Sequence, residues 1–202
     1  MRNIAHESPE TSTALHVLRE RTNSLHARLD SQSELAVLLE PGCSLADYQT
    51  ATMSLAAAYR GVDSALAKGE RYCPPALPAY IPRLPHLLAD ILLFGLTAPA
   101  SPVFELSAPS SNASYLGMRY VIEGSNLGAR VIYRSLQNSD IAQSIGVDKC
   151  YWSSAQTWQL SWPALLRKLA ELRTHKEWDE AANSACLVFE HFIRFLTPEK
   201  RS

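Results

Sequence analysis

Residues 120–132 read Tyr-Val-Ile-Glu-Gly-Ser-Asn-Leu-Gly-Ala-Arg-Val-Ile, and they decide the fold. Their hydrophobic spacing predicts the middle of one long helix over about 112–137. Gly124 and Gly128 lie in it, although a glycine inside a helix costs about 1 kcal/mol relative to alanine. At a spacing of four residues both glycines lie on one helix face. That face has no side chains for two turns, so a flat ligand or a second helix can lie against the backbone.

The sequence on both sides of this stretch is also helical in pattern. A hydroxyl, a proline and an acid at residues 8–10 predict the start of a first helix that extends to about residue 29. A further helix is expected over about 44–68, where Ser44 and Asp47 predict a capping box at its start. Others are expected over about 84–95, 161–173 and 176–196, with a short apolar run at 34–39. Alternating strand patterns are nearly absent. The sequence therefore predicts an all-α protein, one domain over residues 1–202 with flexible ends at 1–10 and 197–202.

Composition excludes several classes of function. A net charge of −1, with both signs mixed along the chain, gives no basic surface for nucleic acid or an anionic membrane. No signal peptide and no uninterrupted apolar run long enough for a membrane span is found, so we expect a soluble, cytoplasmic protein. The four cysteines are too widely spaced for a metal knuckle, and reduced thiols are expected at Cys43, Cys73, Cys150 and Cys186.

His26 is the histidine with the most informative surroundings. It lies in the first predicted helix at the edge of the Leu18/Leu25/Leu29 stripe, and Arg19 lies seven residues earlier on the same side, about 10 Å along the axis. A neutral imidazole is a good iron ligand, and an arginine at that distance can hold a carboxylate of the same ligand. With the glycine face, this pattern suggests a porphyrin between two helices, although paired glycines also serve close helix packing.

Two motifs resemble those of heme oxygenases. Residues 21–30, Arg-Thr-Asn-Ser-Leu-His-Ala-Arg-Leu-Asp, resemble the proximal-helix motif, and residues 120–132 resemble the distal-helix motif of the bacterial members. Their order and separation suit the family, and weaker similarity extends over residues 12–196. The resemblance implies an all-α fold with heme held between a proximal and a distal helix. It also implies that heme, as substrate and cofactor, is cleaved to biliverdin, carbon monoxide and ferrous iron.

The resemblance assigns roles to particular residues. His26 would be the iron ligand, Gly124 and Gly128 would let the distal helix approach the heme, and Arg19 would pair with a propionate. Tyr120 would line the edge of the pocket. Further candidates for the propionates are Arg134 and, as alternatives to it, Arg167 and Lys168.

Ser125 is a departure from part of the family. Animal heme oxygenases have an aspartate directly after the first distal glycine, where it organises water, whereas this chain and some bacterial relatives have a serine. A hydroxyl can still order water but carries no negative charge. Gly124, Ser125 and Gly128 are therefore the expected catalytic set, and activity is less securely implied than heme binding.

The function expected from these motifs is oxidative heme cleavage with dioxygen. No flavin or nicotinamide motif is present, so electrons would come from a donor such as ferredoxin with ferredoxin reductase, and a bilin-accepting protein is a further expected partner. The alternative is a protein of the same fold that binds heme or another tetrapyrrole without turnover. Chemistry at a cysteine nucleophile and a purely structural helical role are weaker readings.

Overall fold

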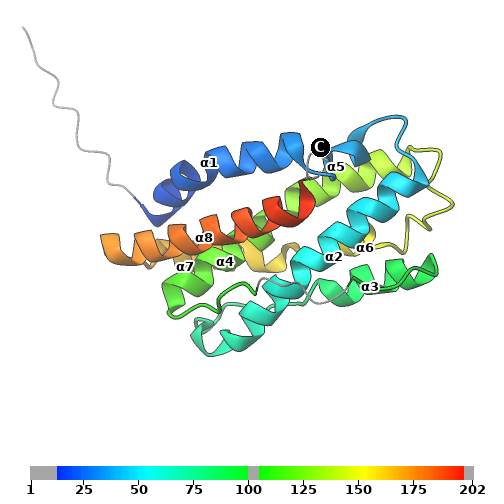
Figure 1. Ribbon diagram of the computed structural model, residues 1–202. Coiled ribbons are helices and arrows are strands. Elements are labelled where there is room, and N and C mark those ends of the chain that lie inside the picture. Colours follow the sequence, from blue (N-terminus) through cyan, green and yellow to red (C-terminus); the bar gives the residue numbers. More distant parts are fainter. Residues whose placement is uncertain (1–12, 100–104, 198–202) are drawn as a thin grey trace, which may run out of the picture.

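The computed structural model describes residues 13–99 and 105–197, and over these residues every regular element is helical, as predicted (Figure 1). The helix start predicted at residues 8–10 and the flexible end at 1–10 lie outside the described residues, as does the end at 197–202 apart from Thr197. The first described helix begins at Ala14, where the Thr13 hydroxyl accepts the His16 N–H and so caps the helix.

The elements follow one another as α-helices joined by short 3-10 turns. In chain order they are α1 (Ala14–Gln32), η1 (Ala36–Leu39), α2 (Leu45–Lys68), η2 (Glu70–Tyr72), α3 (Leu84–Leu93), α4 (Asn112–Gly124), α5 (Asn126–Gln137), α6 (Tyr151–Ser154), η3 (Ala155–Ser161), α7 (Trp162–Ala170) and α8 (His175–Leu196).

Capping groups fix where the longer helices begin. The Ser44 side chain accepts the Asp47 N–H while the Asp47 carboxylate accepts the Ser44 N–H, which confirms the predicted capping box of α2. Thr174 and Glu177 form the same arrangement at the start of α8. These reciprocal bonds satisfy backbone N–H groups that have no partner within the helix.

The prediction of one continuous helix over about 112–137 is wrong. The helix ends at Gly124 and a new one begins at Asn126. The reason is local, because the Ser125 hydroxyl donates to the Ile122 carbonyl at 2.8 Å. A serine that bonds back to the preceding turn competes with the backbone ladder and bends a helix.

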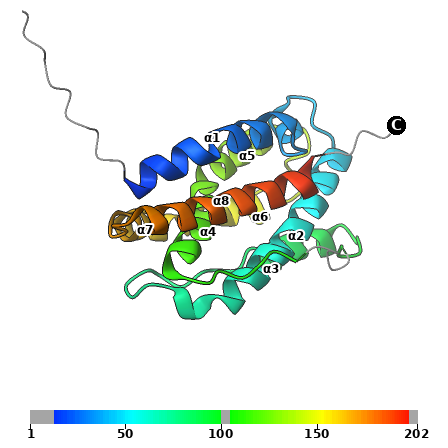
Figure 2. The same ribbon diagram turned by 60° about the vertical axis from the view of Figure 1, so that its left-hand side comes forward.

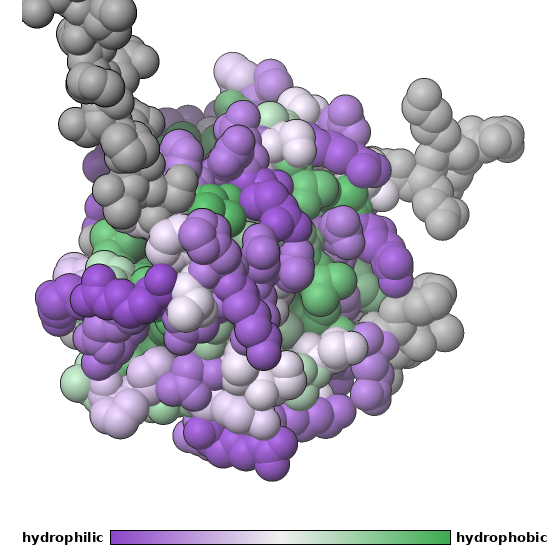
Figure 3. All heavy atoms as spheres, turned by 90° about the vertical axis from the view of Figure 1, so that its left-hand side faces the viewer, coloured by the Kyte–Doolittle hydropathy of each residue, from purple (hydrophilic) through white to green (hydrophobic). Residues whose placement is uncertain are grey.

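The hydrophobic core surrounds α8. This helix runs through the middle of the molecule and packs against α1, α2 and α4 (Figures 1 and 2). Phe189 and Phe192 of α8 are buried with Leu18 of α1, Val62 of α2 and Ile122 of α4. On the end of the molecule where α8 begins, hydrophobic residues show only between hydrophilic ones (Figure 3).

Other expectations from composition can be compared with the structure. Cys43, Cys73, Cys150 and Cys186 are all free, as predicted. Among the residues that the structure describes, no three metal-ligating side chains gather into a cluster, and no helix has the length and apolar character of a membrane span. A heme site in this fold would therefore rest on a single ligating side chain with an apolar surround.

Candidate functional site

His26 lies on the exposed side of α1, beyond the buried stripe that packs on α8. Its side chain is 62% exposed, its Nδ1 lies 2.8 Å from Asp30 Oδ2, and its ring centroid lies 5.6 Å from that of Phe189. An ionised carboxylate only accepts hydrogen bonds, so Asp30 places the proton of a neutral His26 on Nδ1 and leaves the Nε2 lone pair free. Asp30 was not predicted to belong to the site, although its spacing of four residues from His26 is a detectable signal.

The glycines of the chain fall into two groups according to their surroundings. A Cβ at Gly61 would lie 2.7 Å from the His191 ring, and a Cβ at Gly117 would lie 2.0 Å from the Ala181 carbonyl oxygen, so close packing requires glycine there. A Cβ at Gly124 would make only ordinary contact with Trp162, at 3.7 Å, and a Cβ at Gly128 would meet nothing within 4 Å. Packing within the protein does not explain why Gly124 and Gly128 are glycines.

Large exposed apolar side chains lie on the same helix as Gly128 and on the element that contacts it. Leu127 is 64% exposed and Val131 is 54% exposed, both on α5, and Leu39 of the neighbouring η1 is 45% exposed. Large exposed hydrophobic side chains beside an uncovered helix face are typical of a surface that binds an apolar ligand.

The side chains of Arg19, on α1, and Tyr120, on α4, interact with each other. Burial raises the pKa of the Tyr120 phenol, while the Arg19 charge and a hydrogen bond with Arg19 act against the rise. The Tyr120 ring also lies 5.8 Å from the ring of Trp162, the first residue of α7. The fold thus brings Arg19 and Tyr120 together, although they are about a hundred positions apart in the sequence. Both were predicted to bind the same ligand.

Residue counts give the expected positions of His26 and the glycines along their helices. Both α1 and the α4–α5 pair run from left to right in Figure 1, and α5 lies beside the C-terminal half of α1 in Figures 1 and 2. Measured from the Arg19–Tyr120 contact, His26 is about 10 Å further along α1, and Gly124 and Gly128 are about 6 and about 12 Å further along the other segment.

Neighbouring elements hold α1 and the α4–α5 pair in this arrangement. Helix α7 contacts both α1 and α4, and η1 contacts both α1 and α5. These shared contacts hold the helix that carries His26 and the segment that carries Gly124 and Gly128 in one part of the fold.

Ser125 adjoins a buried polar group as well as the exposed face. Burial raises the pKa of the Tyr59 phenol, and the Arg83 charge and hydrogen bonds with Tyr151 and Ser125 act against the rise. The Ser125 side chain therefore lies within reach of the buried Tyr59 hydroxyl, while its own proton is given to the Ile122 carbonyl.

The remaining predicted propionate partners are less closely tied to the site. Arg134 is exposed in the last turn of α5, six residues beyond Gly128. Arg167 is exposed near the end of α7. Lys168 lies 3.0 Å from the Glu171 carboxylate, which already balances its charge.

Two contributions to the site were missed from the sequence. Trp162 lies against Gly124 and Tyr120, although it is 38 residues beyond Gly124 in the sequence. No local pattern indicates this contact. Glu123 was given no role from the sequence, and it is buried and lies 2.8 Å from Arg119.

Comparison with known proteins identifies the fold. No family of known proteins matches the sequence, and no curated protein is significantly similar to it. Among solved structures, the chain is similar to the heme oxygenase from Neisseria meningitidis, determined in NO- and CO-bound forms, with a TM-score of 0.63 and 19% sequence identity. The match covers 93% of this chain and 98% of that one. The protein thus has the all-helical fold of a heme oxygenase.

Proposed function

We propose that this protein binds heme between α1 and the α4–α5 break and cleaves it oxidatively to biliverdin, carbon monoxide and ferrous iron. The observation that carries the proposal is the open space at Gly128, on the helix that lies beside the C-terminal half of α1 in Figures 1 and 2. A Cβ there would touch nothing within 4 Å, so a ligand outside the chain explains the glycine better than packing does. The heme-oxygenase-like fold supports the same reading.

The residues present fit a heme. His26 offers Nε2 to the iron because Asp30 holds its Nδ1 proton at 2.8 Å, an arrangement that orients ligating histidines in many metal sites. Gly124 and Gly128 would leave room for the macrocycle against the backbone, and the exposed Leu127 and Val131 would shield it from water. Arg19 and Tyr120 would bind a propionate at the edge.

Heme, when bound, supplies the iron that binds dioxygen and the macrocycle that is oxidised. The protein would contribute position and an ordered water. Ser125 is the polar side chain nearest the glycine face, and its oxygen accepts hydrogen bonds from water even while its proton is held by Ile122. Electrons would come from a separate donor such as ferredoxin with its reductase, and the biliverdin would pass to solvent or to a bilin-accepting protein.

Binding of heme without turnover is the second candidate function, and one observation favours it. The Ser125 hydroxyl donates to the Ile122 carbonyl at 2.8 Å, so this proton is not free to be given to a bound ligand. A protein with the same pocket but without a proton donor at this position would hold heme for storage or delivery.

Adding hemin to the purified protein tests both candidates. A Soret band that forms with one equivalent, and that converts to biliverdin absorption when dioxygen and ferredoxin with its reductase are supplied, is the result expected for the enzyme. A Soret band that persists under these conditions would instead indicate the binding protein. If no Soret band forms, both candidates are wrong.

A matched pair of histidines provides the control. His26 and His16 both lie on α1, are 62% and 61% exposed, and each has a carboxylate four residues later. His26→Ala should abolish or shift the Soret band, and His16→Ala should leave it unchanged. If the two variants give the same Soret band with hemin, His26 is not the iron ligand.

A further inference from the structure

A buried charged cluster lies beside the break between α4 and α5. Each member of the cluster is no more than 4% exposed. The members are Arg83, Arg119, Glu123 and Asn126. Charges are rarely buried so completely without a partner, because removing them from water is costly. The proposed heme contacts use none of these four side chains, so the cluster needs its own explanation.

Glu123 is the centre of the cluster. Its Oε1 accepts one hydrogen bond from Arg119 Nε at 3.0 Å and lies 2.8 Å from Arg119 Nη2. Its Oε2 lies 3.7 Å from Arg83 Nη2 and accepts a hydrogen bond from Asn126 Nδ2 at 3.4 Å. One carboxylate therefore joins the end of α4, the residue that precedes α3 and the first residue of α5.

The partners of Glu123 are themselves attached to the surrounding structure. Arg119 donates to the Pro78 carbonyl at 3.2 Å, in the connector before α3. The Arg83 guanidinium lies 3.7 Å above the Trp158 ring, and the Trp158 carbonyl accepts a second hydrogen bond from Asn126 at 3.4 Å. Glu123 is thus held in place from three directions, and Asn126 is held by both Glu123 and η3.

The backbone at the break does not fix the direction of α5 by itself. Ser125 has φ −63° and ψ −16°, within the ordinary right-handed helical region, so no strained dihedral angle specifies the bend. The Ser125 hydroxyl weakens the helical ladder at this point. The side chain of Asn126 is the nearest group on α5 that ties the new helix to fixed parts of the protein.

We propose that Glu123 is a positioning residue that, through Asn126, fixes the direction of α5 and thereby the position of Gly128 relative to His26. A rigid, flat ligand leaves little tolerance in the separation of the two helices that hold it. The consequence for heme rests on the function proposed above, whereas the effect on α5 holds for the ligand-free protein. Buried polar groups that specify one arrangement are known in other proteins.

The test compares Glu123→Gln with Asp90→Asn. Asp90 is a buried carboxylate that accepts from the Tyr48 hydroxyl at 2.7 Å and the Tyr151 N–H at 3.0 Å, and these two partners lie on α2 and α6. In the ligand-free protein, Glu123→Gln should speed amide hydrogen exchange over residues 124–131 by roughly tenfold, the factor expected for one lost hydrogen bond to a charged group. Asp90→Asn should leave exchange over these residues unchanged.

Hemin binding supplies the second measurement. Glu123→Gln should weaken hemin binding by roughly tenfold while the ferric Soret band stays where it is, because His26 still ligates the iron. Asn126→Leu leaves the Arg119–Glu123 pair intact and removes only the tie to α5, so it should reproduce both effects and replaces Glu123→Gln if that variant does not fold.

The outcomes separate this inference from the proposed function. Suppose that wild type binds hemin, but both variants have exchange rates over residues 124–131 and hemin affinities within twofold of the wild-type values. The positioning role is then wrong. If exchange increases in the variants but wild type does not bind hemin, the positioning role stands and the heme function fails.

Discussion

Gly117 and Gly128 belong to the same stretch of broken helix but meet opposite surroundings. A Cβ at Gly117 would lie 2.0 Å from the Ala181 carbonyl oxygen, because α4 and α8 cross there with their backbones in close approach. A Cβ at Gly128 would meet no atom within 4 Å. One glycine is required by the folded protein, and the other remains unexplained until a ligand is considered.

Alanine at Gly128 is expected to separate folding from binding. Gly128→Ala should leave the free energy of unfolding of the ligand-free protein unchanged or raise it by up to about 1 kcal/mol, since alanine favours a helix and no clash results. The same variant should bind hemin more weakly, because the new methyl group occupies the space proposed for the macrocycle. Chemical denaturation and hemin titration measure the two effects.

Gly117→Ala is the control for this substitution. Its methyl group has to displace backbone of α8, so the free energy of unfolding should fall by about 1–3 kcal/mol. Hemin affinity of Gly128→Ala equal to that of wild type would show that Gly128 does not face the heme.

Asp30 should control how His26 holds the iron. Asp30→Ala removes the acceptor of the Nδ1 proton, so the ring is less well oriented and is a weaker base. We expect hemin affinity or turnover to fall by roughly 10- to 100-fold, the usual effect of losing the hydrogen-bond partner of a ligating histidine. Glu20→Ala, next to the exposed His16, is the matched control and should have no effect. If Asp30→Ala has the hemin affinity and turnover of wild type, the Asp30 carboxylate has no role in orienting His26.

Arg19 should decide how the macrocycle is rotated about the iron–histidine axis. Arg19→Ala removes a cation that interacts with Tyr120, so the propionate loses an anchor. The mixture of biliverdin isomers should change, and hemin affinity should fall modestly, by about two- to fivefold. Arg28→Ala removes an equally exposed cation from α1, two residues past His26 and therefore on another side of the helix. Product analysis that finds the same isomers in Arg19→Ala and wild type would exclude Arg19 from the role.

The part of the site that the sequence indicates is the part with local signals. His26 and Arg19 follow from helical spacing within α1, and the Gly124/Gly128 pair stands out because two glycines are unfavourable in one helical stretch. The capping boxes that start α2 and α8 are equally local, and the one at Ser44 was predicted correctly.

The rest of the site depends on contacts between distant segments. Burial of Arg83 and Arg119 runs against the usual preference of arginine for the surface, and only the folded chain brings both to Glu123. The break at Ser125 was missed because a serine inside a hydrophobic helical pattern carries no separate signal; its bond to the Ile122 carbonyl decides the outcome.

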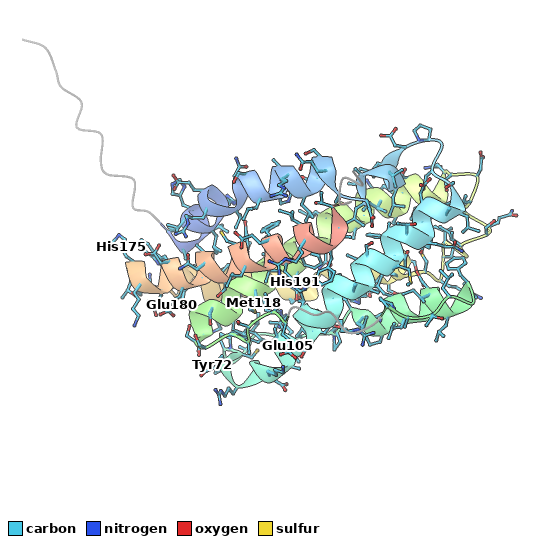
Figure 4. All side chains as sticks on the ribbon, in the orientation of Figure 1. Tyr72, Glu105, Met118, His175, Glu180 and His191 are labelled. Carbon is cyan, nitrogen blue, oxygen red and sulfur yellow. The ribbon has the colours of Figure 1, made fainter. Side chains whose placement is uncertain are left out.

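His191 should make stability depend on pH, independently of any ligand. The ring is buried on α8 where that helix passes α2, and Nε2 donates to the Ala58 carbonyl at 2.9 Å (Figure 4). Burial lowers the pKa of His191 below 6.5, and the nearby Arg194 charge lowers it further, although the bond to Ala58 acts in the opposite direction. The folded state therefore favours the neutral ring.

The sign of the effect follows from which state takes up the proton first. Above about pH 6.5 the ring is neutral in both states and its contribution is fully present; as the pH falls, the unfolded chain is protonated first and stability is lost until the lowered folded pKa is reached. Between about pH 7.5 and about pH 5.5, the free energy of unfolding should fall more in wild type than in His191→Gln, in which the side-chain amide can still donate to Ala58. The buried carboxyls Asp63 and Asp90, whose pKa values burial raises, are present in both proteins and cancel in the comparison. His16→Gln, at an exposed site, should keep the wild-type dependence of the free energy of unfolding on pH. If wild type and His191→Gln show the same dependence, His191 is protonated as easily in the folded protein as in the unfolded chain.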